Sequence, residues 1–240
     1  MNKELLEIIH HFETLGQDFV VGNRNKIKII PYNDVLLNIK SFKVPGFING
    51  IIYRFFRKSK AERSFVYAKV LKNNNIGTPE PIAFYENKTG LRLLDSYYIC
   101  EHLEVDYVFK ELFNKDIPEL DEILKQFAHF CFKLHEAGIE FLDHSPGNTL
   151  IKKRLDNQYD FYLVDLNRMK FHDKMDFTTR MRNLRRITPS EYMVKIISSE
   201  YAKLCNKTEN EVFEEMWKHN VLFHKKFDRK RKIKKKLNIK

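Results

Sequence analysis

An amphipathic helical segment, followed by a polar loop and two apolar strands, constrains this chain more than any other feature. Residues 121–137 have helical periodicity, and Gly138 supplies a C-terminal stop. The next residues, 141–151, form a polar loop that turns into a strand, and 159–169 predicts a second strand. The apolar face of the helix is formed by Phe127, Phe130, Cys131 and Leu134. We therefore expect a helix, a loop and a β-hairpin in direct succession.

Three oxygen-bearing side chains lie in this unit. Asp143 and Asn148 are on the polar loop, and Asp165 ends the apolar run FYLVD. Phosphoryl transfer needs a group that accepts or orients the incoming hydroxyl, and oxygen ligands for magnesium. A carboxylate and an amide on one loop can face the same metal ion as a carboxylate on the neighbouring hairpin. Each residue alone is more typical of a turn or a strand end than of a site, but the three together, at this spacing after a long helix, predict a phosphotransfer site.

The first hundred residues have a different character, with mostly β-rich segments and little strong helical periodicity. We expect a hairpin that contains Gly22, because the β-rich stretch 19–30 is followed by a turn signal at 31–34 and then by the strand 35–43. The segments are a short helix at 4–13, a β-rich stretch at 19–30, a turn at 31–34, a strand at 35–43, a break at 44–50, one or two helices at 51–73, a loop at 73–81, and strands at 81–86 and 97–103.

The order of these segments predicts an α+β fold with two lobes. A small N-terminal lobe, residues 1–103, would be built on an antiparallel sheet. A mainly helical C-terminal lobe would comprise 104–224, and a basic tail would comprise 225–240.

The loop sequences resemble those of a known superfamily. LDHSPGNTLI followed by LVDLNRM is similar to the catalytic and metal-binding loops of protein-kinase-like enzymes, with the offset D-x-x-x-x-N. The usual His-Arg before the catalytic Asp is replaced by Phe141 and Leu142. The usual Asp-Phe-Gly is replaced by Asp165, Leu166 and Asn167. These departures argue against an ordinary protein kinase and favour the small-molecule and glycolipid branch.

A nucleotide lysine follows from the same resemblance. LLNIKSFK resembles the strand motif V-A-I-K, which implies that Lys40 contacts the nucleotide phosphates. Lys43 is an alternative on the opposite face of the same predicted strand. The acidic partner of this lysine would be Glu62, the only acid between Asp34 and Glu80.

Two further nucleotide contacts are predicted by position. The segment around Gly22 has no G-x-G-x-x-G pattern, but backbone N–H groups near Gly22 and Asn23 could cradle phosphate. An ordinary hairpin is the alternative. The strand at 97–103 would run into a hinge, where backbone groups of Glu101 to Leu103 would meet adenine.

Over about residues 16–170 the chain resembles the lipopolysaccharide-core sugar kinases, the Kdo and heptose kinase family. The resembling stretches are NIKSFKVP, KAERSFVYAKVL, IGTPEPIAFYE, DHSPGN and VDLNRM. The resemblance implies a two-lobed kinase-like fold and transfer of the γ-phosphate of ATP to a hydroxyl of an inner-core sugar, at the cytoplasmic membrane face. It implies these roles: Asp143 as catalytic base, Asn148 and Asp165 as Mg²⁺ ligands, and Lys40 with Glu62 as the nucleotide-positioning pair.

Positive charge favours an anionic acceptor. The formal net charge is +11, and 225–240 holds ten Lys or Arg and one Asp. That tail would bind anionic lipid, or form a disordered and nonspecific arm. Arginine suits bidentate contacts with the carboxylates and phosphates of a lipopolysaccharide core, although a solvated helix face is equally consistent with the pattern. The arginines after the metal loop are Arg168, Arg180, Arg182, Arg185 and Arg186, of which Arg168, Arg182 and Arg185 are the predicted acceptor ligands.

Three other functions stay open. A kinase for a cationic small molecule would need an acidic pocket, and the arginines oppose that. A nucleic-acid-associated protein with an inactive kinase fold agrees with the tail but not with the intact Asp143, Asn148 and Asp165 set. A RIO-type protein kinase is also basic and small. The three scattered cysteines, and an N-terminus without an apolar stretch, predict a cytoplasmic protein. The family resemblance and the positive charge imply that it works at the inner face of the cytoplasmic membrane.

Overall fold

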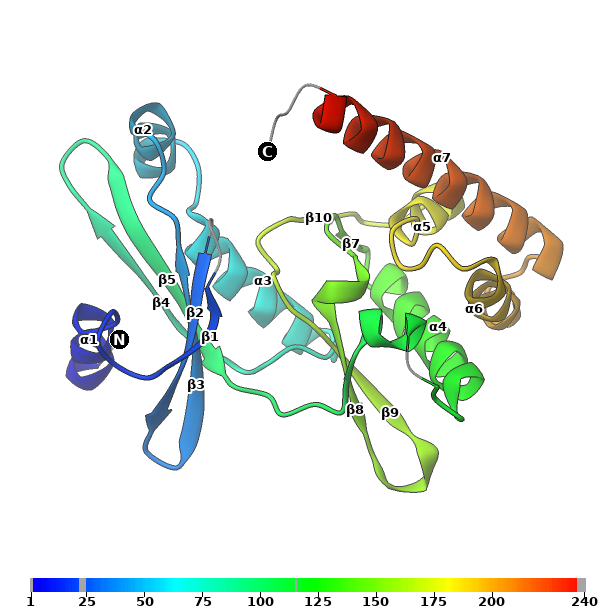
Figure 1. Ribbon diagram of the computed structural model, residues 1–240, viewed down its shortest axis with the longest axis horizontal. Coiled ribbons are helices and arrows are strands. Elements are labelled where there is room, and N and C mark those ends of the chain that lie inside the picture. Colours follow the sequence, from blue (N-terminus) through cyan, green and yellow to red (C-terminus); the bar gives the residue numbers. More distant parts are fainter. Residues whose placement is uncertain (1, 22–24, 115, 237–240) are drawn as a thin grey trace. The chain divides into compact units, whose positions relative to one another are not determined.

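The computed structural model describes residues 2–21, 25–114 and 116–236. The chain divides into two compact units (Figure 1). The N-terminal unit comprises Met1–Glu104 and Asp165–Arg168, and the C-terminal unit comprises Val105–Val164 and Met169–Lys240. No described helix is both long enough and apolar enough to cross a bilayer.

An antiparallel sheet of the order β1-β2-β3-β5-β4 forms the N-terminal unit. Tyr32 pairs with Val35, so β2 and β3 are joined by a two-residue turn. Asn33 in that turn has φ 50°, a conformation that asparagine tolerates better than most residues. The strands are β1 (Gln17–Val21), β2 (Asn25–Tyr32), β3 (Val35–Phe42), β4 (Pro81–Lys88) and β5 (Leu93–Glu101).

Three helices accompany this sheet. α1 (Lys3–His10) covers one face, where its residues pack on alternate residues of β3 and β5. α3 (Lys60–Asn73) lies on the other side and contacts β4 and β5 (Figure 1). Ser59 caps α3 by accepting a hydrogen bond from the Glu62 amide at 3.0 Å. α2 (Phe47–Phe55) follows β3 and contacts β5.

Helices dominate the C-terminal unit. Its core joins α4 to α5, α6, α7 and the β8–β9 hairpin, with Phe127, Phe161 and Tyr201 among the buried residues. The helices are α4 (Leu120–Glu136), α5 (Phe177–Asn183), α6 (Glu191–Leu204) and α7 (Glu209–Lys236), with short 3-10 turns at Phe109–Phe113, Pro146–Asn148 and Leu155–Asn157. The strands are β6 (Tyr107–Val108), β8 (Thr149–Lys153) and β9 (Tyr159–Leu163) in one sheet, and β7 (Ile139–Phe141) paired with β10 (Met169–Phe171).

These elements confirm the predicted α+β class and most predicted segments. Several details differ. The predicted strand 159–169 ends at Leu163 as β9, and a separate strand, β10, begins at Met169. The predicted strand 97–103 is β5, which begins at Leu93 and ends at Glu101. The β-rich stretch 19–30 contains parts of two antiparallel strands, β1 and β2. The predicted break at 44–50 already contains the start of α2, since its glycines do not prevent a helix. α7 runs without interruption across the predicted boundary at 224/225.

Candidate active site

A closed loop between β7 and β8 carries Asp143 and Asn148. The side-chain nitrogen Nδ2 of Asn148 donates to the main-chain oxygen of Asp143 at 2.9 Å, and the Asn148 amide donates to Ser145 at 2.9 Å. The oxygen of Asn148 accepts from the Val164 amide at 3.0 Å, which ties the loop to the strand before Asp165. With Nδ2 engaged, the side-chain oxygen Oδ1 of Asn148 is the atom left to meet a cation.

His144 anchors this loop in the core. Its ring lies 5.8 Å from the ring of Phe127 and 5.6 Å from that of Phe141, measured between centroids. Burial lowers the pKa of His144 to about 4, an effect only partly offset by the neighbouring Asn183 amide. The imidazole is therefore neutral near pH 7 and behaves as a core side chain beside Asp143.

Arg186 holds the carboxylate of Asp143. Its Nη1 donates to Oδ1 of Asp143 at 2.9 Å, and its guanidinium lies over the ring of Phe223 in α7 at 5.5 Å. Arg186 lies in the arginine-rich stretch of the sequence but was not among the predicted site residues. No local pattern could do so, because the pair spans 43 residues.

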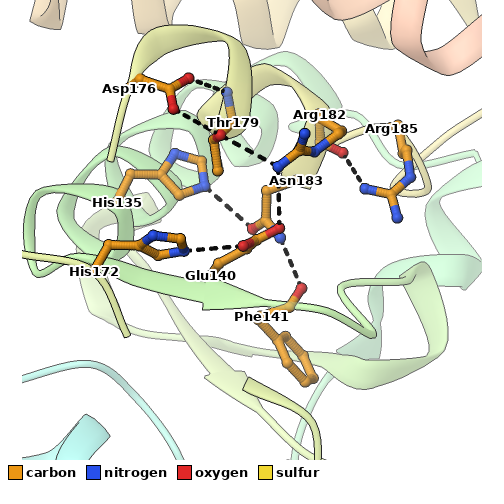
Figure 2. A network of polar contacts seen from close by, with 9 residues as sticks. All are labelled: His135, Glu140, Phe141, His172, Asp176, Thr179, Arg182, Asn183 and Arg185. Atoms are coloured by element: carbon orange, nitrogen blue, oxygen red, sulfur yellow. Dashed lines mark hydrogen bonds and ion pairs between the residues drawn. The ribbon is translucent and has the colours of Figure 1, made fainter. Parts of the chain in front are cut away.

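Asn183, at the end of α5, braces the strand that leads into the loop (Figure 2). Its Nδ2 donates to the main-chain oxygen of Phe141 at 2.8 Å, while its Oδ1 lies 3.2 Å from Nε2 of His135. His135 must donate from Nε2, so its Nδ1 accepts from the Tyr201 hydroxyl at 2.9 Å. This tautomer is neutral, as expected where burial lowers the pKa of His135 to about 3.

The predicted acceptor arginines Arg182 and Arg185 lie beside this brace. Arg182 donates to the hydroxyl of Thr179 at 3.2 Å and lies 3.7 Å from the buried carboxylate of Glu140, which also contacts His172 at 3.0 Å (Figure 2). Arg185 donates to the main-chain oxygen of Arg182 at 2.6 Å. Burial, with the charges of Arg186 and Arg182, lowers the pKa of Arg185. Three guanidinium groups thus gather near the Asp143 loop.

The N-terminal unit carries a second set of predicted site residues. Nζ of Lys40 donates to Oδ1 of Asp165 at 2.6 Å, and Nδ2 of Asn167 donates to the same oxygen at 2.7 Å. Asp165 has φ 59°, a left-handed conformation that costs about 1–2 kcal/mol in most residues and is concentrated at functional sites. Arg168, the third predicted acceptor ligand, is exposed at the end of this segment.

Lys40 and Glu62 have different ion-pair partners from those expected. Within the described chain, Lys40 pairs with Asp165, and Glu62 pairs with Lys58 at 3.2 Å. Lys43 lies just beyond the end of β3 and is exposed, whereas only 12% of the Lys40 side chain is exposed. The predicted pair of Lys40 with Glu62 is not the one that this structure contains.

The predicted hinge begins where β5 ends. The Glu101 amide donates to Glu80 at 3.0 Å and the His102 amide donates to Leu36 at 2.6 Å, so successive residues bond to opposite neighbouring segments. Leu103 is the first residue of the hinge beyond these two sheet contacts. Gly22, the predicted phosphate-loop residue, lies outside the described residues.

Comparison with known proteins decides the family. The model of the lipopolysaccharide kinase (Kdo/WaaP) family matches residues 49–207, more than half of the chain. The chain belongs to this lipopolysaccharide kinase family. It is therefore a phosphotransferase that acts on a sugar hydroxyl, as the sequence resemblance implied. None of the curated protein sequences matches it.

Solved structures show that this lipopolysaccharide kinase has the kinase-like fold. WaaP in complex with acyl carrier protein is similar, with a TM-score of 0.62 and 13% identity over 93% of this chain and 92% of that one. The complex of Rio2 kinase from Chaetomium thermophilum with ADP/Mg²⁺ and phosphoaspartate has a TM-score of 0.54 and 13% identity, over 88% and 66% of the two chains. The predicted fold class is confirmed.

This kinase has Phe141 and Leu142 in place of the usual His-Arg before the Asp143 loop. The ring of Phe141 is fully buried, and its main-chain oxygen accepts from both the His144 amide, at 3.1 Å, and the Asn183 side chain. Apolar packing and an asparagine brace therefore fix this strand.

Proposed function

We propose that this lipopolysaccharide kinase transfers the γ-phosphate of ATP to a hydroxyl of an inner-core sugar, Kdo or heptose. The observation that carries the proposal is the hydrogen-bonded Asp143–Asn148 loop, which supplies a carboxylate and an amide oxygen, in a chain that also pairs Lys40 with Asp165. These are the residue types that kinases use to position a hydroxyl and a nucleotide.

Asn148 and Asp165 would hold Mg²⁺. The donor set suits this hard cation, because it consists of an amide oxygen and a carboxylate. Magnesium, when bound, neutralises charge on the phosphates. Lys40 would contact the nucleotide phosphates from β3, and Asp165 already holds its ammonium in place. Glu62 would replace Asp165 as the partner of Lys40 once nucleotide is bound.

Asp143 would act as the catalytic base for the sugar hydroxyl. Arg186 donates to Oδ1 of this carboxylate, which would orient the group to accept the proton or position the hydroxyl. Arg186 is thus a positioning residue that limits the rotation of the carboxylate.

Arg168, Arg182 and Arg185 would bind the anionic groups of the acceptor. Glu140 offsets part of the charge of Arg182. No carboxylate of the described residues forms an ion pair with Arg185, which favours it as the stronger anion ligand of the two.

The predicted domains then take distinct roles. Residues 1–103 would bind ATP, with adenine at Glu101 to Leu103 and phosphate near Gly22. Residues 104–224 would bind the sugar and catalyse transfer. The basic residues of 225–240 would contact anionic lipid at the inner face of the cytoplasmic membrane, each charge contributing about 1 kcal/mol near the surface.

The deciding experiment measures transfer of labelled γ-phosphate from ATP to purified lipid A–core. Asp143→Asn should lower kcat by about 10²–10⁴-fold, the usual contribution of a positioned base. Asp156→Asn is a matched control, because Asp156 is exposed in the β8–β9 turn and undergoes the same change of charge. Phosphorylation of a protein or an aminoglycoside, without phosphorylation of core sugar, would reject the proposal.

The lipid role of the tail has its own test. Deleting 225–240 should reduce binding to vesicles that contain phosphatidylglycerol, and the loss should shrink as salt is raised. Vesicle binding that is unchanged by the deletion would reject the lipid role of the tail.

A further inference from the structure

The apolar stripe of α2 faces outward. Ile48, Ile52 and Phe55 are spaced at i, i+4 and i+7, and they are 73%, 39% and 56% exposed. In a helix of a globular protein this stripe normally lies against the core. In α2 the core contact is made by the opposite side.

Gly50 explains that orientation. It is buried, and a Cβ at this position would lie 3.0 Å from the main-chain oxygen of Leu93 and 3.2 Å from the Cβ of Arg92. The missing side chain thus lets α2 approach the backbone of β5 closely. Nε of Arg54 adds a hydrogen bond to Thr89 at 3.2 Å. The packed side of the helix is therefore fixed, and the stripe is held outward.

Two aromatic residues at the ends of the helix extend the apolar surface. Phe56 is 83% exposed and lies 6.4 Å from Phe55 between ring centroids, and Phe47 is also exposed. We call the set Phe47, Ile48, Ile52, Phe55 and Phe56 the α2 stripe. An apolar set of this kind on a short, polar-flanked helix marks a binding surface.

The charges around the α2 stripe indicate what it binds. No Asp or Glu occurs between Asp34 and Glu62. The guanidinium of Arg54 lies 5.5 Å from the Phe55 ring centre, and that of Arg57 lies 5.9 Å from that of Tyr53. Lys43 and Lys60 add further positive charge close by in the chain, while the charge of Lys58 is paired with Glu62. Apolar side chains bordered by cations suit the boundary between acyl chains and anionic headgroups.

We propose that the α2 stripe inserts into the surface of an anionic bilayer and holds the N-terminal unit there. This contact goes beyond the tail contact proposed above, because it depends on apolar burial as well as charge. It also does not require that the protein phosphorylate core sugar, although it would bring such an enzyme to a lipid-anchored acceptor.

Flotation of the full chain with vesicles tests the proposal. The vesicles would contain phosphatidylethanolamine with about a quarter phosphatidylglycerol, to mimic an anionic leaflet. The triple variant Ile48→Ser/Ile52→Ser/Phe55→Ser should bind at least about tenfold more weakly, because three apolar side chains no longer leave water. It should keep its circular dichroism and melting temperature, because all three side chains are exposed.

Matched single variants check that position matters. Ile48→Ser should weaken binding, whereas Leu155→Ser, 88% exposed in the C-terminal unit, should not. In a chain that lacks 225–240, the three substitutions should weaken vesicle binding beyond the effect of the deletion alone. Transfer of phosphate to a deacylated, water-soluble core oligosaccharide should be the same in wild type and triple variant. If neither protein transfers phosphate to this acceptor, the proposed function fails, whatever the vesicle binding shows.

Three results would overturn the inference. The first is wild-type flotation of the triple variant. The second is a wild-type dimer, seen by sedimentation, that the triple variant loses, since the stripe would then bind a second copy. The third is binding of an acidic carrier protein, lost in the triple variant, without any binding of wild type to vesicles.

Discussion

Mild acid should destabilise the folded chain through two buried histidines beside the catalytic loop. Burial lowers the pKa of His135 to about 3 and that of His144 to about 4, against an ordinary value of 6.5. Between about pH 6.5 and 4.5 the unfolded chain therefore binds two protons that the native chain excludes. Stability is fully present above pH 6.5 and is lost as pH falls.

The size of the effect follows from linkage. Each histidine costs about 1.4 kcal/mol of unfolding free energy per pH unit across this window, so two cost about 3 kcal/mol per unit. From pH 6.5 to 4.5 the loss approaches about 5 kcal/mol, as much as the whole stability of many domains. Glu119, Glu200 and Glu215 have lowered pKa values, and their stabilisation is lost only below about pH 4.5.

Urea unfolding followed by the fluorescence of Trp217 measures how the free energy of unfolding changes with pH. It would be carried out at about pH 7.5, 6.5, 5.5 and 4.5. His144→Phe removes one titrating group from an aromatic environment and should roughly halve the slope. His10→Gln, at an exposed position of α1, should leave it unchanged. A wild-type stability that is flat across the window, or a His144→Phe slope equal to that of wild type, would refute the reasoning.

Three further predictions follow from single contacts. Lys40→Met should lower kcat by about 10²–10³-fold while the exposed Lys43→Met does not, measured as phosphate transfer to lipid A–core. Gly138→Ala should cost about 2 kcal/mol or more in urea unfolding, because Gly138 has φ 68° and a Cβ would lie 2.0 Å from the main-chain oxygen of His172. Arg186→Met should lower kcat about tenfold with little change in KM, and Arg186→Lys should restore part of the loss.

Each of these has an outcome that contradicts it. Equal kinetics for the two lysine variants would mean that Lys40 is not the nucleotide lysine. A fully stable Gly138→Ala would mean that β7 and β10 can separate at no cost. A large rise in KM for Arg186→Met would assign Arg186 to acceptor binding.

Local patterns explain which elements were predictable. α4 has a long periodic face and a glycine stop, and β9 alternates buried and partly buried residues, so both elements were predicted, although the predicted strand extended beyond Leu163. α2 was predicted to begin later because Gly46 and Gly50 are typical of breaks. In the structure Gly50 serves a close backbone approach, which a sequence pattern does not distinguish from a turn.

Some residues of the candidate site could likewise be predicted from local patterns, and others could not. Asp143 and Asn148 are five residues apart, so their shared loop could be predicted from spacing alone. Lys40 and Asp165 are 125 residues apart, and only the resemblance suggested that both belong to one site. Their direct pairing was not predicted, since the usual partner of such a lysine comes from the helix that carries Glu62.

α7 connects the basic C-terminal residues to the catalytic loop. The ring of Phe223 lies under the guanidinium of Arg186, which holds Asp143. Nδ2 of the buried Asn220 donates to the main-chain oxygen of Thr188. These two contacts hold α7 just before the basic segment that begins at residue 225. The described part of the tail, through Lys236, continues this helix. If anionic lipid binds to the tail, it binds to the same helix that contacts Arg186 through Phe223. Truncation after residue 224 removes the basic residues but keeps Phe223, whereas truncation after residue 219 also removes Asn220 and Phe223. Comparing the kcat values of the two truncated proteins separates lipid attraction from positioning of Asp143.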